Sequence, residues 1–129
     1  MKKKILIVAA NYYTHILDGL LHSAKKKLPT PINLIKVPGV FEIPVMISKH
    51  IHNMDGAIAL GCVIKGETPH FEFISKASID AIMKLSIEHK KPIGNGIITC
   101  LNQIQASARS QTKGQEAANA VIRVLKQIL

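Results

Sequence analysis

Aromatic residues are scarce in this 129-residue chain, where they make up 4% of the sequence and tryptophan is absent. Hydrophobic residues account for 47%, so the core must be aliphatic, and the length suits a single domain spanning 1–129. Long apolar runs are also missing, since none approaches the roughly 18 residues that a membrane span needs. Basic Met1–Lys4 and apolar Ile5–Ala10 together look like a short signal peptide, but Asn11 ends the apolar stretch too early. We interpret this segment as a first strand and expect a cytoplasmic protein with no membrane partner.

Cysteines and the common cofactor motifs are equally sparse. The two cysteines, Cys62 and Cys100, fit a reducing compartment, and we interpret both as small, partly buried hydrophobic residues. Among the six histidines, His15 and His22 fall two helical turns apart on one face, but no set resembles three or four convergent metal ligands. The glycine-rich motifs of phosphate loops and dinucleotide-binding folds are absent. We therefore expect neither a metal nor a nucleotide cofactor.

Acidic residues are few, because 8 Asp and Glu stand against 17 Lys and Arg, which gives a formal net charge of +9. Such a charge favours binding of nucleic acid, attraction of anionic small molecules, or simply a solvated lysine-rich surface. The lysines form the short runs Lys2–Lys4, Lys25–Lys27 and Lys90–Lys91 at the edges of apolar elements. No basic stripe carries interleaved aromatic residues, so we prefer the solvated surface and expect no nucleic-acid partner.

Hydrophobic periodicity predicts strands that alternate with helices. Apolar runs predict strands at 4–9, 32–37, 57–64 and 92–99, and helical spacing predicts helices at 16–28, 41–52, 71–89, 101–109 and 115–129. We expect the polar segment 110–114 to separate the last two helices. This alternation predicts an α/β fold: a three-layer αβα sandwich around a four-stranded parallel sheet.

The predicted helix at 71–89 is apolar on more than one side, through Ile74, Ala77, Ile79, Ala81, Ile82, Met83, Leu85 and Ile87. A stripe this wide exceeds what one face of a sheet can cover. A helix buried deep inside a single chain is the alternative, but a chain this short offers few places for one. We expect the second apolar side to contact another subunit.

Ligands of open parallel sheets bind outside the carboxyl ends of the strands, which here selects segments 10–13, 37–42, 62–70 and 99–102. In the third, a glycine-containing loop leads to a helix start where backbone N–H groups can hold a phosphate. His70 at that start suits proton transfer near neutral pH, although a lone histidine is more often structural. Arg109 suits bidentate binding of a phosphate or carboxylate, or is a plain surface residue. One of Tyr12 and Tyr13 could stack on a flat heterocycle, or both could cap the core.

Several motifs together resemble those of the lumazine synthase family. Val37–Pro44 reads VPGVFEIP, which is similar to the family's VPGAFEIP, and Ala59–Phe71 reads ALGCVIKGETPHF, which is similar to its ALGxVIRGxTxHF. Asn102–Arg109 resembles the stretch that ends in the family's phosphate-binding arginine, and Lys113–Ala118 resembles its KGxEAA. The likeness spans nearly the whole chain, in order. It implies a flavodoxin-like pentamer with active sites between subunits and no cofactor.

The reaction that this resemblance implies joins 5-amino-6-(D-ribitylamino)uracil to 3,4-dihydroxy-2-butanone 4-phosphate. The products are 6,7-dimethyl-8-ribityllumazine, phosphate and water, in the penultimate step of riboflavin biosynthesis. Holding two substrates in register supplies much of the acceleration of such a condensation.

By position, the resemblance implies substrate contacts from Tyr12, Val40, Phe41, Glu42, Cys62, Val63, Ile64, Glu67, Thr68, Asn95, Arg109 and Lys113. His70 is the implied catalytic residue, which shuttles protons during imine formation, phosphate elimination and ring closure. The resemblance further implies that Tyr12 stacks on the pyrimidine and that the polar edge of the pyrimidine meets the backbone of residues 63–64. It implies that Phe41 and Glu42 contact the ribityl chain, with Glu42 accepting hydrogen bonds from its hydroxyl groups.

Further roles concern the phosphate and the neighbouring subunit. The resemblance implies that Glu67 and Thr68 offer backbone N–H groups to the phosphate and that Arg109 of the adjacent subunit pairs with it. Asn95 falls on a position that lines the heterocycle pocket, and Lys113 matches the lysine of the KG motif.

The chain also departs from the family pattern. Tyr12 replaces the usual phenylalanine, Asn11 and Tyr13 replace an arginine and an asparagine, and Glu67 stands where alanine or glycine is common. The segment from Arg109 to 113 is shorter than the family's usual AGTKAGNKG stretch. Because the first strand begins almost at residue 1, we expect a free pentamer rather than a larger cage. The alternatives are a non-catalytic binder of flavin or lumazine, a nucleic-acid-binding domain, and an enzyme of the riboflavin synthase type.

Overall fold

Strands and helices alternate along the chain. The structure is a computed structural model that describes residues 3–28, 32–66 and 70–127. Within these ranges the order is β1 (Ile5–Ala10), α1 (Thr14–Lys25), β2 (Ile32–Val37), η1 (Val40–Glu42), α2 (Ile43–His50), η2 (Ile51–Asn53), β3 (Gly56–Ile64), α3 (His70–His89), β4 (Ile93–Cys100) and α4 (Gln103–Leu125). The η elements are single turns of 3₁₀ helix. The predicted α/β class is confirmed.

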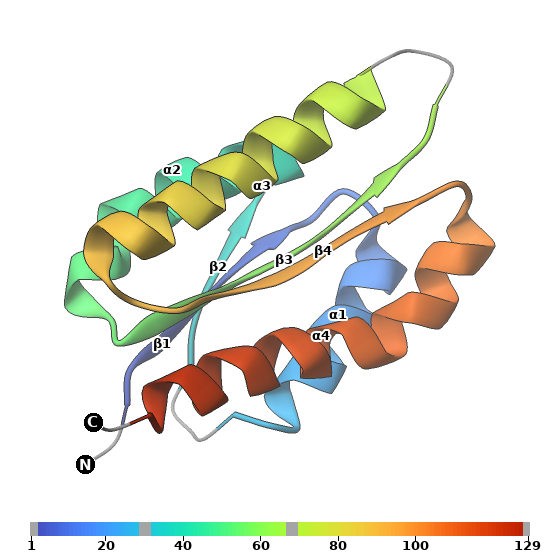
Figure 1. Cartoon of the computed structure of the whole chain (residues 1–129). Coiled ribbons are helices and arrows are strands. Elements are labelled where there is room, and N and C mark those ends of the chain that lie inside the picture. The colour runs from blue at the N-terminus through green and yellow to red at the C-terminus, as the bar shows by residue number, and fades with distance from the viewer. Residues whose placement is uncertain (1–2, 29–31, 67–69, 128–129) are drawn as a thin grey trace.

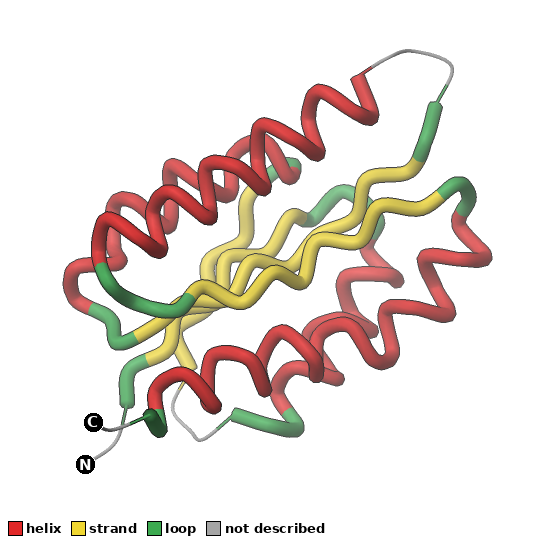
Figure 2. Tube along the Cα trace, in the orientation of Figure 1, coloured by secondary structure: helices red, strands yellow, loops and turns green. Residues whose placement is uncertain are grey.

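The four strands form one parallel sheet in the order β2-β1-β3-β4. Helices α1 and α4 cover one face, and α2 and α3 cover the other, which gives the predicted three-layer sandwich (Figures 1 and 2). In register, Ile7 of β1 lies opposite Leu34 of β2 and Ile58 of β3. The chain thus moves outward from β1 in one direction to β2 and then in the other direction to β3. This reversal of strand order defines where a ligand site is expected.

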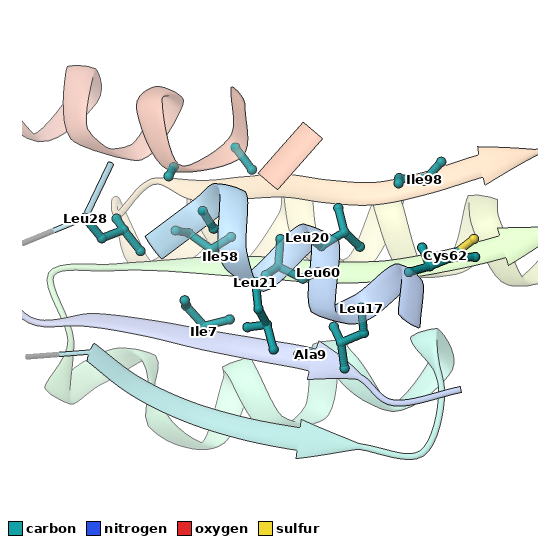
Figure 3. Packing of buried hydrophobic residues seen from close by; sticks show 14 of the residues in the cluster. Ile7, Ala9, Leu17, Leu20, Leu21, Leu28, Ile58, Leu60, Cys62 and Ile98 are labelled. Atoms are coloured by element: carbon teal, nitrogen blue, oxygen red, sulfur yellow. The ribbon is translucent and has the colours of Figure 1, made fainter. Parts of the chain in front are cut away.

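The core has two halves because successive side chains of each strand point to opposite faces. Ile7 and Ala9 of β1 pack with Ile58 and Leu60 of β3 against Leu20 of α1, on the face that α1 and α4 cover (Figure 3). The alternate residues of β1, Leu6, Val8 and Ala10, pack on the face of α2 and α3. Each fully buried aliphatic side chain stabilises the fold by roughly 1.5–3 kcal/mol. Both faces of β1 and β3 are therefore covered by helices, as the continuous apolar runs of these strands predict.

Helix α4 corrects the predicted pair of helices at 101–109 and 115–129, because it runs unbroken from Gln103 to Leu125. The expected break at 110–114 is instead the place where α4 packs on α1. Gly114 is buried there, and a Cβ on it would collide with the carbonyl oxygen of Leu20 and the Ser23 hydroxyl. That hydroxyl donates to the Ser110 carbonyl over 3.1 Å. Small polar residues in this stretch thus serve close helix packing rather than a loop.

Two smaller differences concern helix ends. Helix α1 stops at Lys25 rather than at 28, before Pro29 and Pro31, which lie outside the described residues. The single helix predicted at 41–52 is divided into η1, α2 and η2, with Pro44 in the first turn of α2. Proline is favoured at such a start because its fixed φ suits the first turn and its missing N–H has no helical partner there. Pro44 therefore suits the point at which α2 begins, directly after η1.

Candidate active site

A cleft of about 420 Å³ lies at the carboxyl ends of β1, β2 and β3, where the strand order reverses. This is the position at which doubly wound parallel sheets bind their ligands. The loops after β1 and β2, the end of β3 and one residue of α3 form its walls, with the lining residues Tyr12, Tyr13, Pro38, Gly39, Val40, Phe41, Glu42, Cys62, Val63, Ile64 and Ile74.

The cleft brings together seven of the residues that the sequence predicts as substrate contacts, namely Tyr12, Val40, Phe41, Glu42, Cys62, Val63 and Ile64. They come from three separate segments, which the parallel sheet gathers at one edge. Pro38 and Gly39 also line the cleft; they belong to the predicted ligand-binding segment 37–42, although they are not among the predicted substrate contacts. Ile74, which the sequence predicts only as part of an apolar helix side, lines the cleft as well. No local signal marks Ile74, which reaches the cleft only through the packing of α3.

The absence of a side chain at Gly61 lets η1 approach the sheet. A Cβ on Gly61 would lie 2.7 Å from a methyl carbon of Val40 and 3.2 Å from the Cβ of Ala10. From the other side, the buried Ser78 hydroxyl of α3 donates to the Val40 carbonyl over 3.4 Å. The turn that carries Phe41 and Glu42 is therefore held between β3 and α3. Both side chains are presented to the cleft by this turn.

Exposed aromatic rings border the cleft. Tyr12 is 72% exposed and Phe41 is 63% exposed, although aromatic residues are rare in this chain. Large exposed rings at the rim of a cleft are suited to stacking on a flat ligand. Glu42, half-buried beside them, adds a carboxylate that can accept hydrogen bonds from hydroxyl groups. The arrangement fits a ligand with a planar part and a polyhydroxylated part.

Cys62 forms part of the cleft floor and has no nucleophilic character. Burial, with a smaller contribution from Cys100, raises the pKa of its thiol to about 12, and the positive charge of Arg109 opposes this only in part. Because the thiolate is the nucleophilic form, the thiol is inert at neutral pH. The two buried cysteines are free thiols, as the sequence predicts.

His70 is the first residue of α3, and its ring is exposed. It does not line the cleft itself, but Ile74, one helical turn later, does. Residues four apart lie on the same side of a helix, so His70 is on the side of α3 that carries Ile74 toward the cleft. Glu67 and Thr68, which the sequence predicts as phosphate contacts, lie outside the described residues.

Three predicted contact residues lie apart from the cleft of their own chain. Arg109, in the second turn of α4, donates through Nη1 to the Thr99 carbonyl over 3.1 Å and contacts the Cys100 sulfur at 3.6 Å. Lys113 is half-buried one turn later on the same helix. Asn95 lies opposite Ala59 in the sheet, below the cleft end of β4, and borders a separate hollow under α3. Within one chain these side chains do not join the cleft.

Two classes of site are not found in the described part of the chain. No group of three or more His, Cys, Asp or Glu side chains is placed to hold a metal ion there. None of the helices in that part combines the length and hydropathy needed to cross a membrane.

Fold and site together define a class of protein: a doubly wound α/β protein with an aromatic-rimmed cleft at its topological switch point. The 6,7-dimethyl-8-ribityllumazine synthase family model matches residues 2–128. A relative of that name from Bartonella tribocorum is 42% identical, covering 95% of this chain and 89% of its own length. The 6,7-dimethyl-8-ribityllumazine synthase 1 of Rhodopseudomonas palustris is 41% identical, and the match covers 95% of this chain and 84% of the relative. The enzyme of that name from Kocuria rhizophila is 34% identical, with 92% of this chain and 83% of the relative covered.

The chain belongs to the lumazine synthase family, enzymes of riboflavin biosynthesis. The alignment with the Rhodopseudomonas palustris relative has 137 positions, more than the 129 residues of this chain, so that relative carries residues that this chain lacks.

Proposed function

We propose that this chain condenses 5-amino-6-(D-ribitylamino)uracil with 3,4-dihydroxy-2-butanone 4-phosphate to give 6,7-dimethyl-8-ribityllumazine, phosphate and water. The observation that carries this proposal is the cleft at the switch point, which is lined by exposed rings and a carboxylate. It is also lined by the end of β3, where residues beyond Leu60 have no pairing partner in β1. A ribityl-substituted pyrimidine has a matching flat part and a matching hydroxylated part. Family membership supports the same substrate pair. We propose that the domain spans 1–129.

The heterocyclic substrate occupies the cleft in this proposal. Tyr12 stacks on the pyrimidine, and the backbone of residues 63–64 pairs with its polar edge where β3 ends. Val40 and Cys62 supply the apolar floor. Phe41 packs along the ribityl chain, while the Glu42 carboxylate accepts hydrogen bonds from its hydroxyl groups. The held η1 turn supports this, because a fixed carboxylate loses little freedom when the ligand binds.

His70 carries protons between the two substrates. The pyrimidine amine attacks the ketone carbonyl, and loss of water leaves an imine. Loss of phosphate and ring closure then require proton removal at carbon and proton delivery to a leaving oxygen. An imidazole has one nitrogen that can accept a proton and one that can donate it, so a histidine side chain can serve both steps. The position of His70 at the α3 start, one turn from Ile74, supports this role.

The phosphate is bound at the entrance to α3 and by a neighbouring copy of the chain. We propose that backbone N–H groups of Glu67 and Thr68 face the phosphate, as helix starts favour anions. Arg109, Lys113 and Asn95 approach from the adjacent subunit of a pentamer. Their position outside the cleft of their own chain supports a shared site. The net charge of +9 attracts the phosphorylated substrate.

Exposed apolar side chains of α3 support the pentamer. Phe73, Met83 and Ile87 are all exposed on this helix, while Ser78 and Ile82 are buried against the sheet. A second subunit covers the outer residues in the proposed assembly. We place this assembly in the cytoplasm, where the free thiols Cys62 and Cys100 stay reduced.

The test is lumazine formation from both substrates, followed by absorbance, for the unmodified chain and for His70→Ala. The unmodified chain is expected to exceed the uncatalysed rate, and His70→Ala to lower kcat by about a hundredfold, the usual contribution of a general acid–base. His22→Ala, which removes an exposed histidine from α1, is the matched control and should leave kcat unchanged.

Each other outcome has a definite meaning. An unchanged rate in His70→Ala assigns the proton transfers to substrate or water. A folded oligomer that forms no lumazine is a binding or shell-forming protein instead. Formation of riboflavin from lumazine alone would identify the riboflavin synthase type.

A further inference from the structure

The two tyrosines of the chain are consecutive in the sequence and differ in how firmly they are held. Tyr12 projects from the loop after β1 with 72% of its surface exposed. Tyr13 is half-buried, packs against the core cluster beneath α1, and accepts a hydrogen bond from the Leu17 amide at its carbonyl over 2.9 Å. It also stands directly before α1 as the residue that precedes the first turn. Tyr13 is thus anchored, whereas Tyr12 has few contacts that fix its ring.

The two rings contact each other in a favoured geometry. Their centroids are 4.9 Å apart and their planes meet at 76°, an edge-to-face arrangement. The positive edge of one ring then faces the negative face of the other. This electrostatic attraction adds to the stabilisation that the pair gains from burying apolar surface. Both tyrosines line the cleft. The anchored ring therefore restricts the orientation of the exposed one.

The Tyr13 phenol stays un-ionised over a wider pH range than a free tyrosine does. Burial raises the pKa of its phenol above the ordinary value, with smaller contributions from Cys62 and Tyr12. The neutral phenol keeps a negative charge away from the neighbouring ring well above neutral pH.

We propose that Tyr13 is a positioning residue that holds the Tyr12 ring ready to stack on the heterocyclic substrate. This inference rests on the proposed function, because it assumes that Tyr12 stacks on the pyrimidine. A ring that is already oriented loses less freedom on binding than a mobile one. Ordering one such side chain changes affinity by roughly 2- to 10-fold. Tyr13 therefore acts on ligand affinity through Tyr12 and not by touching the reacting atoms.

The experiment uses the intrinsic fluorescence of the chain, which contains two tyrosines and no tryptophan. In both Tyr13→Leu and Tyr13→Phe, Tyr12 is the sole tyrosine, so the emission belongs to it alone. Tyr13→Phe keeps the aromatic edge and is expected to keep a high anisotropy of Tyr12 emission. Tyr13→Leu removes the edge and is expected to lower that anisotropy. It should also weaken binding of 6,7-dimethyl-8-ribityllumazine about 2- to 10-fold, with a smaller effect on kcat than on binding.

A double-mutant cycle separates this role from a structural one. If Tyr13 acts through Tyr12, the variant with both residues replaced by leucine binds lumazine no more weakly than Tyr12→Leu alone. Fully additive losses, or an unchanged anisotropy in Tyr13→Leu, overturn the inference. Should Tyr13→Leu fail to fold, Tyr13→Met tests the same point.

The Tyr12→Leu variant separates failure of this inference from failure of the proposed function. If Tyr12→Leu does not weaken lumazine binding, the stacking proposed for Tyr12 is wrong and this inference is wrong with it. A loss in Tyr12→Leu but not in Tyr13→Leu contradicts the inference alone.

Discussion

At the scale of single residues, burial decides which side chains of the cleft can react. Cys62 lies at the carboxyl end of β3, next to a proposed ligand, yet its thiol is buried and its pKa is raised to about 12. His70, by contrast, is exposed at the start of a helix. The Cys62 thiol therefore stays protonated at neutral pH and cannot act as a nucleophile, whereas the exposed His70 side chain is open to ligand and solvent.

The raised pKa predicts slow alkylation of Cys62. At pH 8 we expect iodoacetamide to modify it roughly 1000-fold more slowly in the folded protein than in the unfolded chain, because the thiolate is the reactive form and is that much rarer. The rate should keep rising about tenfold per pH unit beyond pH 9, where the unfolded chain levels off. Peptide mass spectrometry distinguishes Cys62 from Cys100. A folded-state rate that levels off near pH 9 would contradict the shift.

The residues of the cleft could be predicted where a local rule applies to them. Tyr12, Phe41 and Cys62 follow or end strands, and the carboxyl ends of parallel strands meet at one edge, so their convergence needs no coordinates. Ile74 could not be found in this way, because only the three-dimensional packing of α3 brings it to the cleft. Nor could the edge-to-face contact of Tyr12 with Tyr13, which depends on the side-chain conformations.

At the scale of elements, the contact between α1 and α4 depends on small side chains. Gly114 and Ser110 of α4 are buried against α1, where the Ser23 hydroxyl lies 3.1 Å from the carbonyls of both Leu20 and Ser110 and shares its one proton between them. These bonds satisfy polar groups that the close approach removes from water. The glycine costs about 1 kcal/mol of helix propensity relative to alanine, which the close packing offsets.

Replacing Gly114 by alanine should therefore destabilise the protein despite the better helix propensity. The added methyl collides with backbone and hydroxyl atoms of α1, and overpacking of this kind costs typically 1–3 kcal/mol. Chemical denaturation measures the change. Gly66→Ala is the control, because a Cβ there meets nothing within 4 Å, and it should alter the free energy of unfolding by less than about 0.5 kcal/mol. An equally stable Gly114→Ala would mean that α1 and α4 separate at little cost.

The prediction of two helices at 101–109 and 115–129 is wrong because α4 is continuous through the polar stretch between them. The polar stretch 110–114 has the composition of a loop, and serine, threonine and glycine there lower helix propensity. Packing overrides that preference, because Ser110 and Gly114 lie four residues apart on one helical face against α1. The strands were easier to predict, since a sheet covered on both faces leaves continuous apolar runs in the sequence.

At the scale of the whole molecule, a single chain holds an incomplete version of the proposed site. The cleft contains the exposed rings of Tyr12 and Phe41 and the Glu42 carboxylate, and His70 begins α3 one helical turn before the cleft residue Ile74. The one arginine assigned to the phosphate, Arg109, is bonded to the end of β4 outside that cleft. The exposed apolar residues of α3 give neighbouring chains a reason to associate. Together these features argue that catalysis requires the assembly.

A site shared between subunits predicts that two inactive variants can restore each other. His70→Ala removes the proton carrier from one side of the site, and Arg109→Ala removes the phosphate contact from the other. When the two chains are mixed equally and reassembled in a ring, about a quarter of the sites combine an intact His70 with an intact neighbouring Arg109. We expect lumazine formation to recover to about a quarter of the unmodified rate, with KM for the phosphorylated substrate returning to normal in those sites.

The control for this restoration pairs His70→Ala with Tyr12→Ala. Both residues border the cleft of the same chain, so every mixed site lacks one or the other, and activity should stay at the level of the separate variants. Unfolding and refolding each variant alone gives the baseline. If the His70 and Arg109 variants also fail to restore activity, although size measurements show mixed oligomers, then Arg109 serves the site of its own chain. In that case it must leave its contacts with Thr99 and Cys100 to reach the phosphate.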